Sequence, residues 1–96
     1  MKTKEFLSTS MNLVEGDRQK DYGDKLHNHS NIAKLWSAYL DIEITAHDVA
    51  ILMALLKVAR TKLGQVSDDT YVDMSAYSAI AGEIKFRTSK KEKGNA

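Results

Sequence analysis

The sequence predicts a small all-α protein, a bundle of about four helices that oligomerisation completes. Three observations support this prediction. The 96 residues include no proline and only five glycines, so little in the chain interrupts helices. Apolar residues recur at helical spacing in four separate segments. A chain of this size, 43% hydrophobic and 28% charged, forms one domain with a limited core, to which a second copy would add.

The composition also excludes several classes of function. The chain has no cysteine, which excludes disulfides and thiolate chemistry. Its net charge of +1 gives no overall electrostatic case for binding nucleic acid. The longest apolar run, VAILMALL, is too short to span a bilayer, and no signal-peptide segment is expected. We therefore expect a cytoplasmic protein that has neither a membrane nor nucleic acid as its partner.

The first two helices are expected on either side of a polar loop. A first helix is predicted from Thr3 to Val14, followed by the loop EGDRQKDYGD. The second helix has one apolar side, and Asn28 lies one turn ahead of it on the same stripe. That side consists of Ile32, Leu35, Trp36 and Tyr39.

The third helix is the most apolar of the four. Thr45 and Asp48 match a capping box in the form that allows Asp at its last position, so the helix begins at Thr45. Gly64 ends it after about Leu63. A helix this apolar is expected at the centre of the bundle, with no apolar stripe left exposed. Its main face consists of Leu52, Leu55, Leu56, Ala59 and Leu63.

The fourth helix is expected to begin after a cap at Ser67 or Asp68 and to reach about Phe86. The single domain then spans residues 1–87. Residues 88–96, TSKKEKGNA, are predicted to form a disordered basic tail, because they are small, polar and charged.

One stripe of the fourth helix carries two carboxylates. Asp69, Asp73 and Tyr77 stand at i, i+4 and i+8, and apolar residues flank them. A carboxylate on a packing face is costly unless it finds a cation, a hydrogen-bond donor or a metal. Asp48 is the acid on the apolar face of the third helix. The stripe is therefore the most informative functional feature of the chain.

Two interpretations of these acids remain open. In the first, Asp48, Asp69 and Asp73 hold Mg²⁺, which prefers oxygen ligands from facing helices. In the second, Asp48 is only a helix cap, and Asp73 forms a buried ion pair with a basic residue. The candidate partners in that pair are Arg18, Lys57 and Arg60.

Further polar residues are candidates for holding a ligand. A loop that concentrates charged and aromatic side chains between two helices is more suited to binding than to packing. Arg60 has either a surface role or a role as a phosphate clamp. The full set of candidates is Arg18, Tyr22, Asp24, Asn28, Lys57, Arg60 and Tyr77.

Four sequence blocks carry a resemblance to a known family. They are RQKDYGD, NHSNIAKLWSAYL, ITAHDVAILMALLKVAR and DDTYVDMSAYSAIAGEI. In this order they resemble small phage and prophage proteins that are grouped as a domain of unknown function, over most of the chain from Arg18 to Ile84. That pattern is similar in turn to the all-α nucleoside-triphosphate pyrophosphohydrolases, the MazG-like and dimeric dUTPase superfamily.

The resemblance implies a homodimeric or homotetrameric enzyme of the host cytoplasm. Such enzymes use Mg²⁺ to cleave a nucleotide between its α and β phosphates, releasing a monophosphate and pyrophosphate. It implies that Asp69 and Asp73 act in catalysis, that Lys57 and Arg60 contact phosphates, and that the loop around Tyr22 contacts the base or sugar.

The chain departs from the superfamily at its metal motifs. Thr70 stands where the Glu of a Glu-x-x-Asp motif is expected, and the Glu-Glu-x-x-Glu motif has no counterpart. The expected function is nucleotide binding, and Mg²⁺-dependent hydrolysis of (d)NTPs is the activity that the resemblance implies, while the missing glutamates favour binding without turnover. The alternative is a non-catalytic helical protein that sequesters a nucleotide or inhibits a host protein.

Overall fold

The computed structural model describes residues 1–16, 25–62, 64 and 66–94, with side chains described as far as Arg87. These residues form helices and no strand, which confirms the predicted all-α class. The helices are α1 (Thr3–Glu15), α3 (Lys25–Leu40), α4 (Ala46–Arg60) and α5 (Asp68–Gly94).

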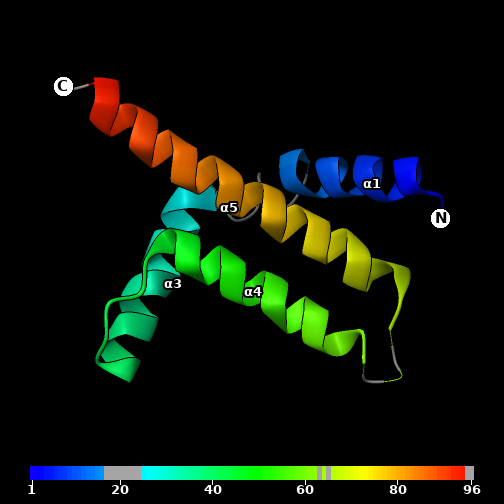
Figure 1. The fold of residues 1–96 in the computed structure, drawn as a ribbon, viewed down its shortest axis with the longest axis horizontal. Coiled ribbons are helices and arrows are strands. Elements are labelled where there is room, and N and C mark those ends of the chain that lie inside the picture. Colours follow the sequence, from blue (N-terminus) through cyan, green and yellow to red (C-terminus); the bar gives the residue numbers. More distant parts are fainter. Residues whose placement is uncertain (17–24, 63, 65, 95–96) are drawn as a thin grey trace.

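Helix α5 is the spine of the fold (Figure 1). Helix α4 runs antiparallel beside it, and this pair makes the most extensive helix contact among the described residues. Helix α1 packs on α5 and runs in the same direction, while α3 packs against α4. Thus α1 and α4 pack on the long helix α5, and α3 packs on α4.

The start of α4 is set by the capping box that the sequence predicted. The Thr45 hydroxyl accepts a hydrogen bond from the Asp48 backbone N–H at 3.0 Å, and the Asp48 carboxylate accepts one from the Thr45 N–H at 3.0 Å. These two bonds satisfy backbone donors that a helix start leaves unpaired. The predicted capping box is confirmed.

The ends of α4 and α5 differ from the predicted ones. α4 ends at Arg60, because the Thr61 N–H and hydroxyl both bond the Val58 carbonyl and tighten the last turn. Gly64, with φ +69°, then supplies the left-handed conformation of the turn. α5 continues beyond Phe86, its predicted end, to Gly94. The disorder of the basic tail in solution stays a prediction.

The core is small and is built largely from small side chains. Val49 is the one large side chain that is fully buried among the described residues. The close approach of two helices needs small residues at the contact, and the buried residues of α4 and α5 include Ala50, Ala76 and Ala81. The buried hydrophobic residues are Ala33, Val49, Ala50, Val72, Ala76, Ala81 and Ile84.

The prediction of which α4 face is buried is wrong. Leu52, Leu55 and Leu56 are 41%, 55% and 44% exposed, whereas Val49 and Ala50 are fully buried. The physical reason is that α4 has two apolar faces, and the one with the smaller side chains allows α5 closer approach. The leucine face is left without a partner within the described part of this chain.

A buried serine fixes α1 on α5. The Ser10 hydroxyl oxygen lies 2.9 Å from both the Phe6 and the Val72 carbonyl oxygens, so its single proton is shared between the two helices. One turn earlier, the rings of Phe6 and Tyr71 meet edge to face at a centroid distance of 6.2 Å. These contacts set the position of α1 along α5.

Candidate functional site

Asp73, the central residue of the predicted site, lies in the α4–α5 interface. Its carboxylate forms an ion pair with the Lys57 ammonium at 3.1 Å, and the two side chains are only 23% and 15% exposed. The structure therefore contains the ion pair that the second interpretation predicted, with Lys57 as the partner of Asp73. A carboxylate and an ammonium at this distance offset the cost of burying either one alone.

Asp48 lies at the other end of the hairpin. It precedes Lys57 by nine residues on α4, which is about 13.5 Å along the helix axis. The hydrogen bond from the Thr45 backbone N–H lowers the pKa of the Asp48 carboxyl below its usual value, against the opposing effect of burial. Asp48 is thus held as a helix cap.

The structure does not assemble the predicted three-carboxylate metal site. Asp69 is exposed in the first turn of α5, Asp73 is paired with Lys57, and Asp48 caps α4. Within the described ranges, no group of three or more His, Asp or Glu side chains is placed to hold a metal ion. The binding of Mg²⁺ stays a prediction.

The predicted ligand residues are spread over the fold. Tyr77 is half-buried and meets the His29 ring edge to face at 6.4 Å, while Asn28 is half-buried in the first turn of α3. Arg60 is exposed at the end of α4. The remaining candidates, Arg18, Tyr22 and Asp24, lie outside the described residues. None of the predicted residues that the structure describes lines the cavity described next.

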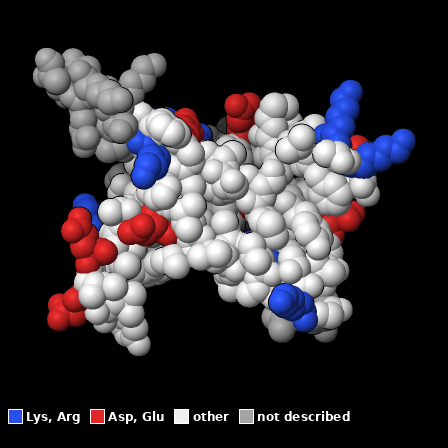
Figure 2. Space-filling model, viewed as in Figure 1, with Lys and Arg blue, Asp and Glu red and all other residues white. Residues whose placement is uncertain are grey.

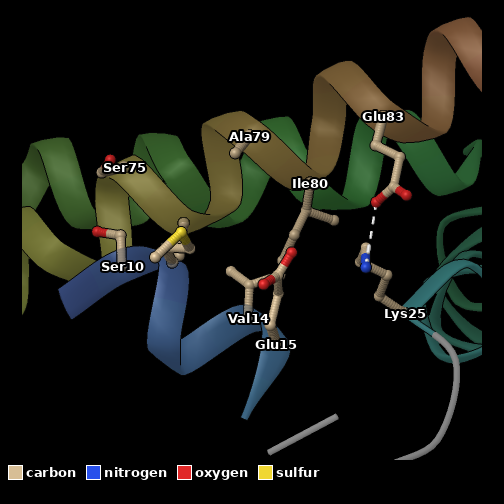
Figure 3. Close-up of a pocket in the computed structure, with 10 residues that line it drawn as sticks. Ser10, Val14, Glu15, Lys25, Ser75, Ala79, Ile80 and Glu83 are labelled. Atoms are coloured by element: carbon tan, nitrogen blue, oxygen red, sulfur yellow. Dashed lines mark ion pairs between the residues drawn. The ribbon is translucent and has the colours of Figure 1, made fainter. Parts of the chain in front are cut away.

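A cavity that the sequence did not predict lies where α1 ends, α3 begins and α5 passes between them (Figure 3). Its volume is about 350 Å³, within the usual range for small-molecule sites. The floor is apolar and small, and the rim is polar. The lining residues are Ser10, Met11, Val14, Glu15, Lys25, Ser75, Ala76, Ala79, Ile80 and Glu83.

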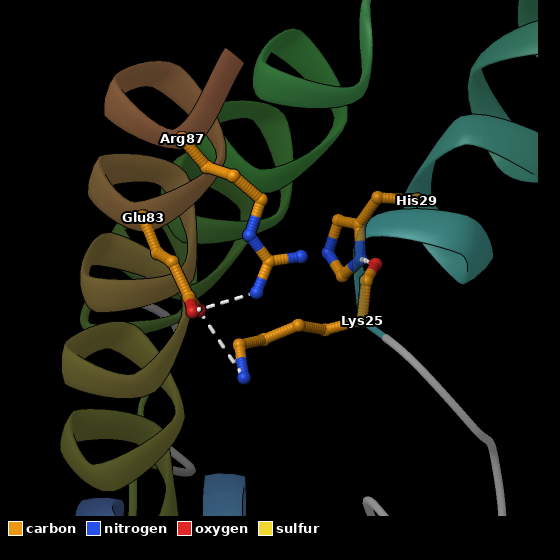
Figure 4. A network of polar contacts seen from close by, with 4 residues as sticks. All are labelled: Lys25, His29, Glu83 and Arg87. Atoms are coloured by element: carbon orange, nitrogen blue, oxygen red, sulfur yellow. Dashed lines mark hydrogen bonds and ion pairs between the residues drawn. The ribbon is translucent and has the colours of Figure 1, made fainter. Parts of the chain in front are cut away.

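The rim of this cavity carries a branched ion-pair network (Figure 4). Glu83 accepts Lys25 at 3.1 Å on one oxygen and Arg87 at 3.0 Å on the other. The Lys25 backbone carbonyl in turn lies 2.8 Å from Nδ1 of the buried His29. Because both oxygens of Glu83 are engaged, this carboxylate is held in place at the edge of the cavity.

Glu15 is the other carboxylate of the rim. It ends α1 and lies beside Val14 and Ile80 in the cavity (Figure 3). Among the residues that the structure describes, it takes part in no ion pair or side-chain hydrogen bond that would occupy it. It is thus an acceptor at the mouth of an apolar cavity.

Sequence reasoning missed the cavity because it depends on α1 meeting α5, across a separation of about sixty residues. One feature of the sequence could have indicated the contact between α1 and α5. Ser10 stands between Phe6 and Val14 at i−4 and i+4, a polar residue in an apolar row. The chain path adds a second connection, since residues 17–24 join Gly16, beside Glu15, to Lys25. Three predicted ligand residues therefore stand in the sequence between Glu15 and Lys25, which both line the cavity.

Helices long and apolar enough to cross a membrane do not occur in the described residues.

Comparisons with known proteins place the chain among phage proteins. A model of a domain of unknown function, DUF6378, matches residues 5–85. The Gene 55 protein of Mycobacterium phage L5 is 43% identical over 81 residues, which cover 83% of this chain and 52% of that protein. The Gene 55 protein of Mycobacterium phage D29 is 38% identical over 82 residues, covering 85% and 54% respectively. The chain spans about half the length of these relatives.

No solved structure matches the chain. The predicted resemblance to a phage domain of unknown function is confirmed. The matches carry no link to the MazG-like pyrophosphohydrolases, so that further resemblance stays a prediction.

Proposed function

The chain belongs to the DUF6378 family, and on that premise we propose that it is a phage protein that binds a nucleotide without hydrolysing it. The observation that carries the proposal is the cavity of about 350 Å³ between α1, α3 and α5. It combines an apolar floor with a few polar groups at the rim, the arrangement that small-molecule sites use.

The chemistry of the lining supports a nucleoside as the part of the ligand that enters the cavity. Val14, Ala79 and Ile80 offer apolar surface to the flat face of a base. Glu15 is placed to accept hydrogen bonds from ribose hydroxyls or from an exocyclic amino group, as carboxylates do in other nucleotide sites. Ser75 adds a hydroxyl that both donates and accepts. Phosphates would then extend out of the cavity, away from the two rim carboxylates.

The positions of the acids favour binding over turnover. Hydrolysis of a triphosphate requires carboxylates that hold Mg²⁺ and orient a water molecule. Here Asp73 is neutralised by Lys57, and Asp48 is engaged by the Thr45 N–H. The non-catalytic alternative that the sequence left open is therefore the one we propose.

A protein partner is part of the same proposal. The sequence predicted a homodimer or homotetramer and, as an alternative, inhibition of a host protein. The exposed aliphatic side of α4 favours a protein partner of either kind. It also contradicts the expectation that no apolar stripe would be exposed.

Thermal unfolding with a panel of NMPs, NDPs and (d)NTPs, with and without Mg²⁺, tests the proposal. A nucleotide at ten times its Kd should stabilise the fold by about 1.4 kcal/mol and raise Tm by several degrees. The stabilisation should not need Mg²⁺, and a parallel assay should detect no pyrophosphate.

A matched pair of variants localises the site. Ala79→Phe fills the cavity from an exposed position on its wall, and Ser78→Phe places the same ring on the neighbouring exposed residue outside the lining. Ala79→Phe should abolish the nucleotide response, and Ser78→Phe should keep it. Equal responses from the two variants would remove the cavity from the proposal. Release of pyrophosphate by the unmodified chain would contradict binding without hydrolysis and support the hydrolase interpretation.

A further inference from the structure

Helix α4 presents an apolar face to solvent that is continuous along its length. Taking 100° per residue, Ile51, Leu52, Leu55 and Val58 lie within about 60° of Leu55 on the helical wheel. This side is opposite to the buried face of Val49 and Ala50. Four large aliphatic side chains that are 38–55% exposed on one face are a mark of an interaction surface. We call these four residues the α4 face.

The charges at the two ends of the α4 face are opposite. Asp48 lies on the same stripe as Leu55, one heptad earlier, and Lys62 follows Leu55 by seven residues, two residues beyond the helix end. Lys62 is exposed in the turn after the helix end, and Asp48 is half-buried at the helix start. Figure 2 shows a largely uncharged surface over α4, with acidic and basic side chains near its start and a basic one near its end. The dipoles of two antiparallel helices point in opposite directions, which favours the same arrangement.

A face of this kind is complementary to itself in one orientation. In an antiparallel pair related by a two-fold axis at Leu55, Lys62 of each copy approaches Asp48 of the other. The leucines meet at the centre of the same pair. A parallel pair would instead place like charges together at both ends. A two-fold interface uses the same patch on both copies, so each favourable contact occurs twice.

The small core explains what a second copy would add. Val49 is the one fully buried large side chain in the described part of the chain, and domains of this size often complete their core by association. The spacing Asp48, Leu52, Leu55, Ala59 and Lys62 alternates steps of four and three residues, the heptad pattern of packed helix pairs. From these observations we infer that the α4 face is a self-association surface on which a second copy packs its own α4 antiparallel.

Sedimentation equilibrium of the chain across a range of concentrations tests the inference. The unmodified chain should form a dimer, and Leu55→Glu should raise the dimer Kd at least 100-fold. The control is Leu7→Glu, which puts the same charge on an equally exposed leucine of α1 and should leave the Kd unchanged. Lys62→Glu should raise the Kd several-fold at low salt and less at high salt, because screening reduces a like-charge contact.

The orientation has its own test, because the chain has no native cysteine to interfere. Under mild oxidation, Leu55→Cys should cross-link two copies at the two-fold axis. Lys62→Cys should not, because the two positions lie at opposite ends of an antiparallel pair. Efficient cross-linking of Lys62→Cys would overturn the antiparallel arrangement. A chain that stays monomeric at all concentrations, or that dissociates equally with Leu7→Glu, would overturn the inference and leave the face to a partner of a different sequence.

Discussion

Replacing Asp73 separates the structural role of this residue from the catalytic one. In the structure, Asp73→Asn leaves the Lys57 ammonium 15% exposed and without its counter-charge in the α4–α5 interface. Breaking a fully buried pair costs about 3–5 kcal/mol, whereas an exposed pair contributes about 0–1 kcal/mol. With side chains 15% and 23% exposed, the pair lies between these limits, so we expect a loss of about 2 kcal/mol.

The assay is urea unfolding at neutral pH and fixed protein concentration, and its double-mutant cycle uses Asp73→Leu, Lys57→Met and the variant that carries both. Lys57→Met should destabilise by a similar amount, because it leaves Asp73 unpaired. The double variant Lys57→Met/Asp73→Leu should recover most of the stability, because two apolar side chains replace a paired charge without leaving one behind. The control Asp69→Asn removes an exposed carboxylate four residues away and should cost about 0.5 kcal/mol or less, the size of a helix-dipole contact.

Two results would refute this reasoning. One is an Asp73→Asn variant as stable as the unmodified chain, which would mean that the pair contributes nothing to the fold. The other is a double variant less stable than either single variant, which would mean that the two positions do not offset each other. A loss of nucleotide turnover without a loss of stability would return Asp73 to the catalytic role that the sequence allowed.

Three further predictions follow from the caps and contacts. Thr45→Ala should cost about 1 kcal/mol in urea unfolding, because it leaves the Asp48 N–H without its acceptor. The lowered pKa of Asp48 means that the folded state prefers its ionised form, so its contribution is present above the unfolded-state pKa near 3.8 and disappears as pH falls through the lower folded-state value. The cost of Asp48→Asn measured at pH 7 should therefore shrink in acid, and a cost that is constant with pH would contradict this. Ser10→Ala should cost about 1 kcal/mol and loosen α1, which hydrogen exchange of the α1 amides would detect, whereas Ser8→Ala on the exposed side should not.

The helices and the start of α4 were predictable because the signals are local. Apolar spacing identified the helical segments, and Thr45 with Asp48 identified the cap. The orientation of α4 was not predictable, because periodicity groups residues on faces without saying which face meets a neighbour. Both Leu55 and Val49 lie on apolar faces, and only the approach of α5 decides between them.

The candidate site was predictable only where its signals are local in sequence. The oddity of Asp73 in an apolar stripe was correctly identified, and its ion pair with Lys57 was one of the two interpretations. The cavity was not predictable, because Glu15 and Ser75 come together only when α1 packs on α5. The grouping of Asp48 with Asp73 also failed, because an antiparallel hairpin places the start of α4 beside the far half of α5.

The pair between Lys57 and Asp73 has a consequence for the way the family can change. An interface of small apolar side chains tolerates a shift by one helical turn, because one small side chain resembles the next. A single buried charged pair fits in one register only. An ancestor that lost one of the two charges would therefore lose its alignment as well as its stability. The two positions are expected to be inherited as a unit, changing together or not at all.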